Sequence, residues 1–149
     1  MANIMNMDNL HIAGTPCTPA VDFYFDTYRL SLSGESYPEN AAAFYRPLIA
    51  KIQDYLHLLT VENDAAQAND FLAQNPPPAI EIHVSLVYFN SSSTKMLFSL
   101  FDTLNQAAQH ALTIALHWYY DKDDDIAEEF GEELHIDFPA LDFHSHILE

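Results

Sequence analysis

The chain has 149 residues, and its five Lys and Arg residues stand against 22 Asp and Glu residues, which gives a formal net charge of −17. Proteins that bind nucleic acid through phosphates need a basic surface, so this acidity excludes DNA and RNA as expected partners. No apolar run approaches the ~20 residues that span a bilayer, and we expect no membrane insertion. Hydrophobic residues make up 49% of the chain. That share is enough for one core, so we expect a single folded domain over residues 1–149.

The cysteine and glycine contents exclude further classes. Cys17 is the single cysteine, so no internal disulfide can form. The first residues lack the basic and then apolar pattern of a signal peptide, and we expect a cytoplasmic protein. Three glycines leave no room for a Gly-rich phosphate-binding loop, which excludes kinases, ATPases and Rossmann enzymes of the common kinds. Half of the acidic residues lie from Asp121 onward, which predicts one acidic face.

Two stretches near the N-terminus alternate apolar and polar residues. Apolar side chains occupy every second position over residues 21–25 and again over residues 30–32, with a short polar turn between them. A period of two is typical of strands with one buried face, so the pattern predicts a hairpin. A shorter stretch at residues 10–13 predicts one more strand before it.

The first helix is expected to begin close to Pro38. Ser36 lies three residues before Glu39, which is the spacing of a helix capping box, and Pro38 would lie in the first turn. Apolar residues then recur at helical spacing over residues 41–59. These features together predict a long amphipathic helix.

A proline interrupts this helical pattern. Pro47 lacks the N–H group of a helical residue, and its ring clashes with the carbonyl four residues earlier, so we expect a kink or break near residues 43–46. Residues 60–78 are polar or Ala-rich and end in three consecutive prolines. They predict a helical extension followed by a stiff linker.

The second half of the chain predicts a strand, a helix and another strand in succession. Apolar residues alternate from Ile80 to Tyr88, and the second half of this stretch is apolar on both faces, as in a central strand. Residues 96–111 have helical spacing, and residues 112–118 alternate again. Such a βαβ unit places its two strands parallel with a right-handed crossover.

The C-terminal part predicts a third helix over residues 124–134 and a short edge strand that contains Ile136 and Phe138. Residues 139–149 are expected to form a flexible tail. The expected fold class is therefore α/β: a single domain with a mixed sheet, an N-terminal hairpin, a βαβ unit and about three helices.

Both loops that leave the carboxyl ends of parallel strands open onto one edge of a sheet, where α/β proteins usually place their sites. This rule brings the hydroxyl cluster from Ser91 to Thr94 close to the acidic loop from Asp121 to Asp125. One side chain, such as Asn90, suffices to cap the helix, and four consecutive hydroxyls exceed that need. The cluster is therefore either a structural cap or a phosphorylation site. A phosphate there would gain from the free N–H groups and would change the surface charge without melting the helix.

The acidic loop also has two interpretations. Asp121, Asp123 and Asp125 alternate as in a calcium loop, but no glycine follows at the turn and the closing Glu is misplaced. Two of these carboxylates could hold Mg²⁺. The favoured interpretation is a solvated helix start, where acids suit the helix dipole.

Eight histidines form no recognised zinc motif, since the His-Glu-x-x-His pattern is absent and Cys17 has no partner at zinc-ligand spacing. His83 and His117 are expected on the faces of neighbouring strands, and a catalytic role for either is the less favoured interpretation. His144 and His146 are expected to be exposed in the tail. No base or oxyanion hole is evident for a serine nucleophile. We expect no catalytic residue, no metal and no cofactor.

Four segments of the chain match one protein family. They are His11-Ile12-Ala13-Gly14-Thr15 with Thr18-Pro19-Ala20, then Ser33-Gly34-Glu35-Ser36-Tyr37-Pro38-Glu39-Asn40, then Tyr88-Phe89-Asn90-Ser91-Ser92-Ser93-Thr94-Lys95, and Trp118-Tyr119-Tyr120-Asp121. In this order they resemble the SiaC family of bacterial regulatory phosphoproteins, and the likeness runs over nearly the whole chain. The second and third segments together are the most specific.

The resemblance implies a STAS-like fold, similar to that of anti-anti-sigma factors, and no catalytic activity. Members of the family are phosphorylated by a partner serine/threonine kinase and dephosphorylated by a PP2C-type phosphatase. The unphosphorylated form binds and activates a diguanylate cyclase, which controls cyclic di-GMP and biofilm formation. These three proteins are therefore the expected partners.

The resemblance also implies site residues. The family's phosphorylated threonine directly follows an Asn, and the matching position here is Ser91, so a serine replaces the threonine. Ser92, Ser93 and Thr94 are the alternative acceptors. The stretch from Glu62 to Pro78 is longer than expected for the family. The expected partner interface comprises Glu35, Tyr37, Pro38, Glu39, Asn40, Asn90, Ser92 and Asp121.

Three other functions remain open at this point. One is a Mg²⁺-dependent phosphate-ester enzyme that uses the loop from Asp121 to Asp125 next to Ser91. Another is a regulator of transcription of the anti-anti-sigma type. The third is an interaction module without phosphorylation, in which Ser91 belongs only to the cap.

Overall fold

The computed structural model describes residues 7–67, 79–110 and 112–148. Its strands form one six-stranded sheet in the order β1 to β6. They are β1 (Leu10–Ile12), β2 (Ala20–Tyr24), β3 (Arg29–Ser36), β4 (Ile80–Phe89), β5 (Ile114–Asp121) and β6 (Asp142–Leu148). The helices are α1 (Ala41–Gln67), α3 (Ser91–Ala108) and α4 (Asp125–Asp137), with a short 3-10 helix, η2 (Phe25–Thr27). The expected mixed α/β class is confirmed.

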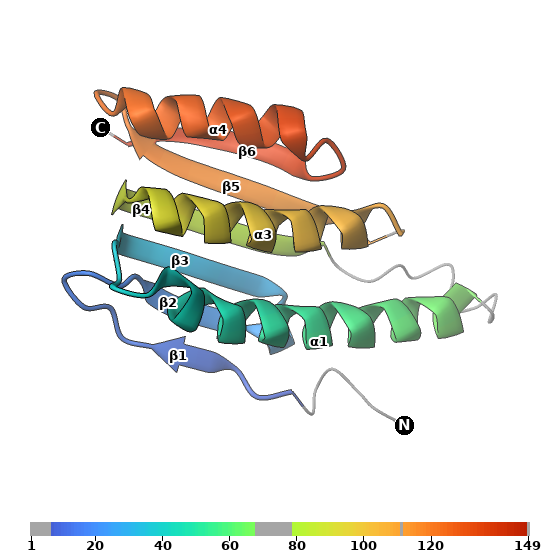
Figure 1. Cartoon of the computed structure of the whole chain (residues 1–149). Coiled ribbons are helices and arrows are strands. Elements are labelled where there is room, and N and C mark those ends of the chain that lie inside the picture. The colour runs from blue at the N-terminus through green and yellow to red at the C-terminus, as the bar shows by residue number, and fades with distance from the viewer. Residues whose placement is uncertain (1–6, 68–78, 111, 149) are drawn as a thin grey trace.

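The sheet changes from antiparallel to parallel pairing at β3. β1, β2 and β3 pair antiparallel, which confirms the expected hairpin and the short strand before it. β3, β4, β5 and β6 pair parallel, which confirms the βαβ unit formed by β4, α3 and β5. A helix follows each of β3, β4 and β5, and the four parallel strands lie side by side in the order of the sequence (Figure 1).

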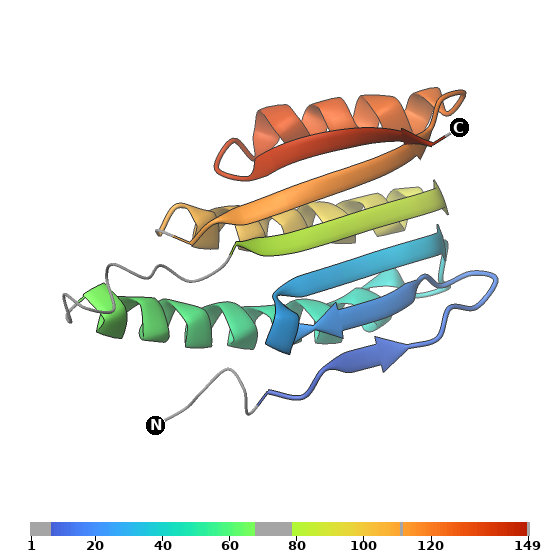
Figure 2. The same ribbon diagram turned by 180° about the vertical axis from the view of Figure 1, so that it is seen from behind.

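The three α-helices of the described residues lie on one face of the sheet, as the views from the two sides show (Figures 1 and 2). The core forms between this face and the helices, and it contains Trp118, Tyr45, Phe23 and Phe101, all buried. Trp118 also donates from its indole N–H to the carbonyl of Ala127 in α4, over 2.8 Å. None of the described helices covers the other face, which we call the open face. Among the same helices, none is long and apolar enough to cross a membrane.

Helix α1 begins later than the capping box predicts. Ser36 is the last residue of β3 and pairs with Phe89 of β4, so its backbone belongs to the sheet and not to the start of a helix. The cap comes from Asn40, whose side-chain oxygen accepts a hydrogen bond from the N–H of Ala43 over 3.0 Å. The expected capping role of Ser36 is therefore wrong.

Of the kink or break expected at Pro47, the break is wrong, because α1 runs through it without interruption, and the kink stays a prediction. Both Pro47 and Ala43 are exposed, so the Ala43 carbonyl that loses its helical hydrogen bond faces water. The expected extension is present as far as Gln67. The three prolines at residues 76–78 lie outside the described residues.

A register shift near the end of β4 reverses its buried and exposed faces. Gly34 pairs with Leu86 and Glu35 with Tyr88, so the pairing skips Val87. Gly34 has a φ of 112°, a conformation that favours glycine. Tyr88 is consequently 51% exposed, although the alternation predicted it on the buried face.

The C-terminal prediction requires two corrections. Ile136 lies in α4 and Phe138 is its C-cap, so neither belongs to an edge strand. The edge strand is β6, which pairs with β5 along its whole length, so residues 142–148 are not a flexible tail. β6 alternates polar and apolar side chains weakly, and its pairing is fixed by a strand far away in the sequence.

Candidate functional site

Three loops meet at one edge of the sheet. They follow β3, β4 and β5, and because these strands are parallel, their carboxyl ends lie together. Helices α1, α3 and α4 all begin at this edge (Figure 1). We call it the carboxyl edge. It holds the segments around Ser91 and Asp121, which the sequence predicts at one edge, and also the segment around Tyr37, which follows β3.

The hydroxyl cluster forms the first turn of α3. Asn90 is the N-cap, and its side-chain oxygen accepts a hydrogen bond from the N–H of Ser93 over 2.9 Å. The N–H of Thr94 donates to the Asn90 carbonyl over 2.9 Å. The N–H groups of Ser91 and Ser92 have no carbonyl within the helix to bind, as at every helix start. The turn therefore presents backbone donors and the positive end of the helix dipole.

The four hydroxyls of the cluster differ in accessibility. Ser91 and Ser92 are exposed, and within the described part of the chain neither hydroxyl has a hydrogen-bond partner. Ser93 is buried and donates to the carbonyl of Ser36 over 2.9 Å. The Thr94 hydroxyl donates to the Asn90 carbonyl over 3.1 Å. Only the first two hydroxyls are free to react.

Ser93 belongs to a buried network of hydroxyls. Ser36 donates to the Ser93 oxygen over 2.7 Å, and its own oxygen lies 2.6 Å from the phenol oxygen of Tyr45. Burial raises the pKa of Tyr45, and the hydrogen bonds to the two serines act in the opposite direction. The phenol therefore stays protonated and can donate to Ser36. This network joins β3, α1 and α3.

Helices α1 and α3 pack side by side, and a shallow hollow lies between their first turns. Arg46 and Lys95 line it, and these are two of the chain's five cations. Ser92 opens onto the same hollow. Lys95 follows Ser91 by four residues, so the two share one face of the helix. Glu39 lines the hollow too, so two cations and one carboxylate lie near the exposed hydroxyls of a strongly acidic protein.

The residues expected at the partner interface are not equally accessible. The exposed ones are Tyr37, Glu39, Asn40, Ser92 and Asp121; Glu35 and Asn90 are half-buried, and Pro38 is buried. Pro38 therefore shapes the loop and offers no contact surface.

Sequence reasoning missed two residues of this surface. Val87 and Tyr88 are 72% and 51% exposed, and the Tyr88 ring lies 5.6 Å from that of Tyr37, centroid to centroid. The exposure of Tyr88 follows from the register shift in β4, and Val87 is the residue that the pairing skips. The only available signal was that residues 86–89 are apolar on both faces.

The acidic loop caps its own helix. Asp121 accepts a hydrogen bond from the N–H of Asp123 over 2.9 Å, and Asp124 accepts one from the N–H of Ala127 over 3.0 Å. Among the described residues, its carboxylates do not bring three ligand atoms together. The geometry supports the favoured interpretation of the loop as a helix start.

Comparison with known proteins agrees with this arrangement. A family model described as SiaC family regulatory phosphoprotein matches residues 12–66 and 65–148. An uncharacterized protein of Pseudomonas aeruginosa strain UCBPP-PA14 is 32% identical over 136 residues, which cover 89% of this chain and 94% of that protein.

Solved structures from Pseudomonas aeruginosa show the same fold. One is SiaC, which is 29% identical with a TM-score of 0.73, covering 94% of this chain and 100% of that one. Another is the diguanylate cyclase SiaD in complex with its activator SiaC, where the match is 28% identical with a TM-score of 0.74 and covers 93% of this chain and 99% of that chain. The family match and the shared fold both extend over nearly the whole chain, and the chain therefore belongs to the SiaC family of regulatory phosphoproteins.

Proposed function

We propose that this protein is a non-enzymatic partner-switch protein that binds and activates a diguanylate cyclase when unphosphorylated, and that phosphorylation of Ser91 ends the interaction. The family match supports a regulatory phosphoprotein, and the similar SiaC is an activator seen in complex with SiaD. The single observation that carries the proposal is the exposed Ser91 hydroxyl at the start of α3, at the carboxyl edge.

Accessibility favours Ser91 over two of the alternatives. A kinase must reach the hydroxyl, and that of Ser93 is buried and bonded to Ser36. The Thr94 hydroxyl is half-buried and bonded to Asn90. Ser92 is also exposed, so the choice between these two rests on the family pattern, in which the acceptor directly follows the Asn. Ser92 is therefore the matched control.

A phosphate at Ser91 changes the surface and leaves the fold intact. It adds roughly −1.5 to −2 charges at the positive end of the α3 dipole, where free N–H groups stabilise it. Lys95, one helical turn later, supplies a cation on the same face. The helix start is therefore stabilised while the edge that meets the partner becomes more negative.

The exposed aromatic residues beside Ser91 supply contact surface for the cyclase. Tyr37 and Tyr88 touch each other and are 40% and 51% exposed. Tyrosines of this kind are frequent anchors in interfaces. The net charge of −17 favours a basic face on the partner, so binding weakens as the salt concentration rises.

The proposal requires two further partners, a serine/threonine kinase and a PP2C-type phosphatase, and it places the protein in the cytoplasm.

To test the acceptor, the purified protein is incubated with a cognate kinase and ATP, and its mass is measured. We expect a gain of one phosphate in the wild type and in Ser92→Ala, and none in Ser91→Ala. A phosphate that remains on Ser91→Ala would show that the acceptor is a different residue.

The switch is tested separately with cyclase activity. Ser91→Ala removes no capping contact and should activate the cyclase as the wild type does, whereas Ser91→Glu should bind and activate it less. Ser92→Glu places the same charge one residue later and is the matched control, expected to have the smaller effect. Circular dichroism of all variants should be unchanged. Equal activation by wild type and Ser91→Glu would contradict the switch.

A further inference from the structure

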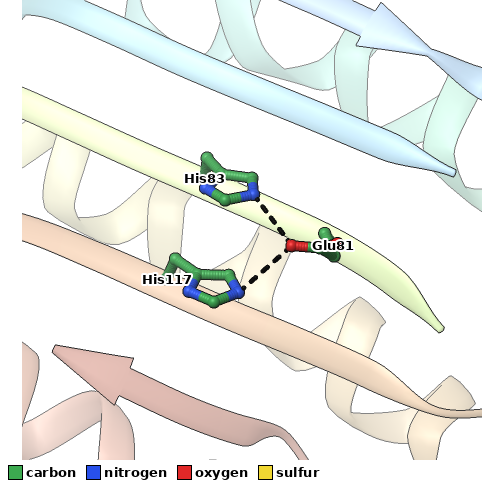
Figure 3. Close-up of side chains that lie close together, drawn as sticks. All are labelled: Glu81, His83 and His117. Atoms are coloured by element: carbon green, nitrogen blue, oxygen red, sulfur yellow. Dashed lines mark hydrogen bonds and ion pairs between the residues drawn. The ribbon is translucent and has the colours of Figure 1, made fainter. Parts of the chain in front are cut away.

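A cluster of titratable side chains lies on the open face of the sheet, away from the carboxyl edge. Glu81 and His83 belong to β4, and His117 of β5 is paired directly with His83. Their neighbours Ile82 and Trp118 point into the core, so these three side chains point to the opposite face. Figure 3 shows them turned toward one another. Glu81 lies near the start of β4 whereas Ser91 follows its other end, so the cluster is separate from the site described above.

The ligand atoms of the three side chains converge. The Nε2 atoms of His83 and His117 lie 3.2 and 3.4 Å from the same oxygen, Oε1 of Glu81 (Figure 3). One ligand atom from each residue lies within 4.8 Å of the others. In a tetrahedral zinc site with bonds of about 2.0–2.1 Å, neighbouring ligand atoms are about 3.3 Å apart. Two of the three separations therefore already match those around a bound ion.

The two imidazole rings require one adjustment. They stack with their centroids 4.4 Å apart and an angle of 4° between their planes. The nitrogen lone pairs of parallel rings do not meet at one point, so each ring must turn about its Cβ–Cγ bond to share an ion. Glu81 is the flexible member, because 48% of its side chain is exposed and it can move to follow the ion.

The far nitrogen of each ring is also held. Nδ1 of His83 lies 2.9 Å from the hydroxyl of Tyr119, and Nδ1 of His117 lies 2.9 Å from Nε2 of His146. Metal-binding histidines usually hydrogen-bond through the other ring nitrogen, which orients the ring and fixes the tautomer. With Nε2 on a metal, each Nδ1–H donates to one of these two partners.

The protonation state suits a metal ligand. Burial lowers the pKa of His83, and the positive charge of Arg29 lowers it further. Burial also lowers the pKa of His117, and its histidine neighbours act in the same direction, while Glu81 opposes both shifts. Neutral imidazole is the form that binds metals.

We propose that Glu81, His83 and His117 form a binding site for a divalent transition metal, with Zn²⁺ as the best fit. Two imidazoles and one carboxylate are a ligand set that suits zinc, and water from the open face completes a tetrahedron. The ion bridges β4 and β5, so it stabilises the folded chain by mass action.

The test uses the full chain without a histidine tag, stripped with EDTA, dialysed and titrated with Zn²⁺ in a calorimeter. We expect one ion per chain and a higher unfolding temperature with zinc. Glu81→Gln and His117→Gln should weaken binding by at least about 100-fold, and Tyr119→Phe by about 10-fold, as for loss of an outer hydrogen bond. His57→Gln, an exposed histidine on α1, is the matched control and should bind as the wild type does.

Two results would overturn the proposal. One is the absence of saturable one-to-one binding by the wild type. The other is unchanged affinity in Glu81→Gln or His117→Gln combined with a loss in His144→Gln, which would assign the metal to the edge strand. If His117→Gln does not fold by circular dichroism, the half-exposed Glu81→Gln decides. Because the readout is zinc binding, failure here leaves the proposed switch untouched.

Discussion

The hydroxyl of Ser93 donates to the backbone carbonyl of Ser36 over 2.9 Å and so joins the first turn of α3 to the end of β3. Both side chains are completely buried, and Tyr45 of α1 completes the network. Ser91, the proposed acceptor, lies two residues earlier and is exposed. Within one polar cluster, Ser93 therefore holds the helix in place, whereas Ser91 presents a reactive hydroxyl.

This division predicts different effects of two neighbouring substitutions. Ser93→Ala leaves the buried Ser36 hydroxyl without its acceptor, and we expect the free energy of unfolding to fall by about 1–3 kcal/mol. Ser92→Ala changes an exposed side chain and should stay within about 0.5 kcal/mol of wild type. Urea unfolding of both variants measures the difference. Equal stabilities would show that the network contributes nothing.

The N-cap of α3 predicts a second effect on stability. Asn90→Ala removes the side-chain oxygen that accepts from the Ser93 N–H, and we expect a loss of about 1 kcal/mol. Asn90→Asp keeps an acceptor at the same place and should retain most of the wild-type stability. Thermal unfolding measured by circular dichroism compares the three proteins. If Asn90→Asp loses as much as Asn90→Ala, the cap is not the cause.

Tyr88 should affect partner binding without affecting the fold. Its side chain is 51% exposed beside Tyr37 at the carboxyl edge, so Tyr88→Ser should weaken binding to the cognate cyclase by more than about fivefold. Tyr24→Ser is the matched control, because Tyr24 is 44% exposed but pairs with Arg29 at the other end of β3. Calorimetric titration of each variant with the cyclase measures both affinities. Equal losses in the two variants would remove Tyr88 from the interface.

Local patterns predicted most of the elements, because periodicity and capping act within one segment. The Asn90 cap, helix α3 and helix α4 follow from residues close together in the chain. β6 did not follow, since its side chains alternate weakly and its place is set by pairing with β5. The break at Pro47 was wrong because exposure of the Ala43 carbonyl depends on tertiary packing.

In the candidate sites too, features that depend on tertiary pairing could not be predicted from local sequence patterns. Parallel strands bring Ser91 and Asp121 to one edge whatever the register, so the carboxyl edge was predictable. The exposure of Tyr88 depends on a register shift, which no alternation in β4 reveals. His83 and His117 were expected on neighbouring strands, but only the register places them opposite each other and next to Glu81.

Gly131 of α4 predicts an exception to helix propensity. Replacement of a helical glycine by alanine ordinarily stabilises a protein by about 1 kcal/mol. Here an added Cβ would lie 2.7 Å from Cδ1 and 3.0 Å from Nε1 of Trp118, which is fully buried and bonded to Ala127. Overpacking against Trp118 should therefore make Gly131→Ala destabilising, with a loss of about 1–3 kcal/mol in the free energy of unfolding. Urea unfolding of Gly131→Ala tests this, and a gain in stability would show that Trp118 moves aside freely.

Two buried tyrosines predict how stability depends on pH in alkaline solution. Burial raises the pKa of both Tyr45 and Tyr55 above the ordinary value of 10.0, and Tyr55 also donates to the carbonyl of Phe25 over 3.2 Å. Above pH 10.0 the unfolded chain releases these two protons while the folded chain keeps them. The folded state then binds more protons, so the free energy of unfolding decreases as the pH rises.

Urea unfolding at a series of pH values from about 8 to about 11 measures this decrease, and the near-ultraviolet absorbance of tyrosinate follows ionisation directly. Of the eight tyrosines, we expect these two to ionise only as the protein unfolds. Tyr55→Phe removes one of the two groups, and although it loses a hydrogen bond, its stability should depend less steeply on pH. Ionisation of all eight tyrosines in one step by a protein that is still folded would contradict the burial that raises these pKa values.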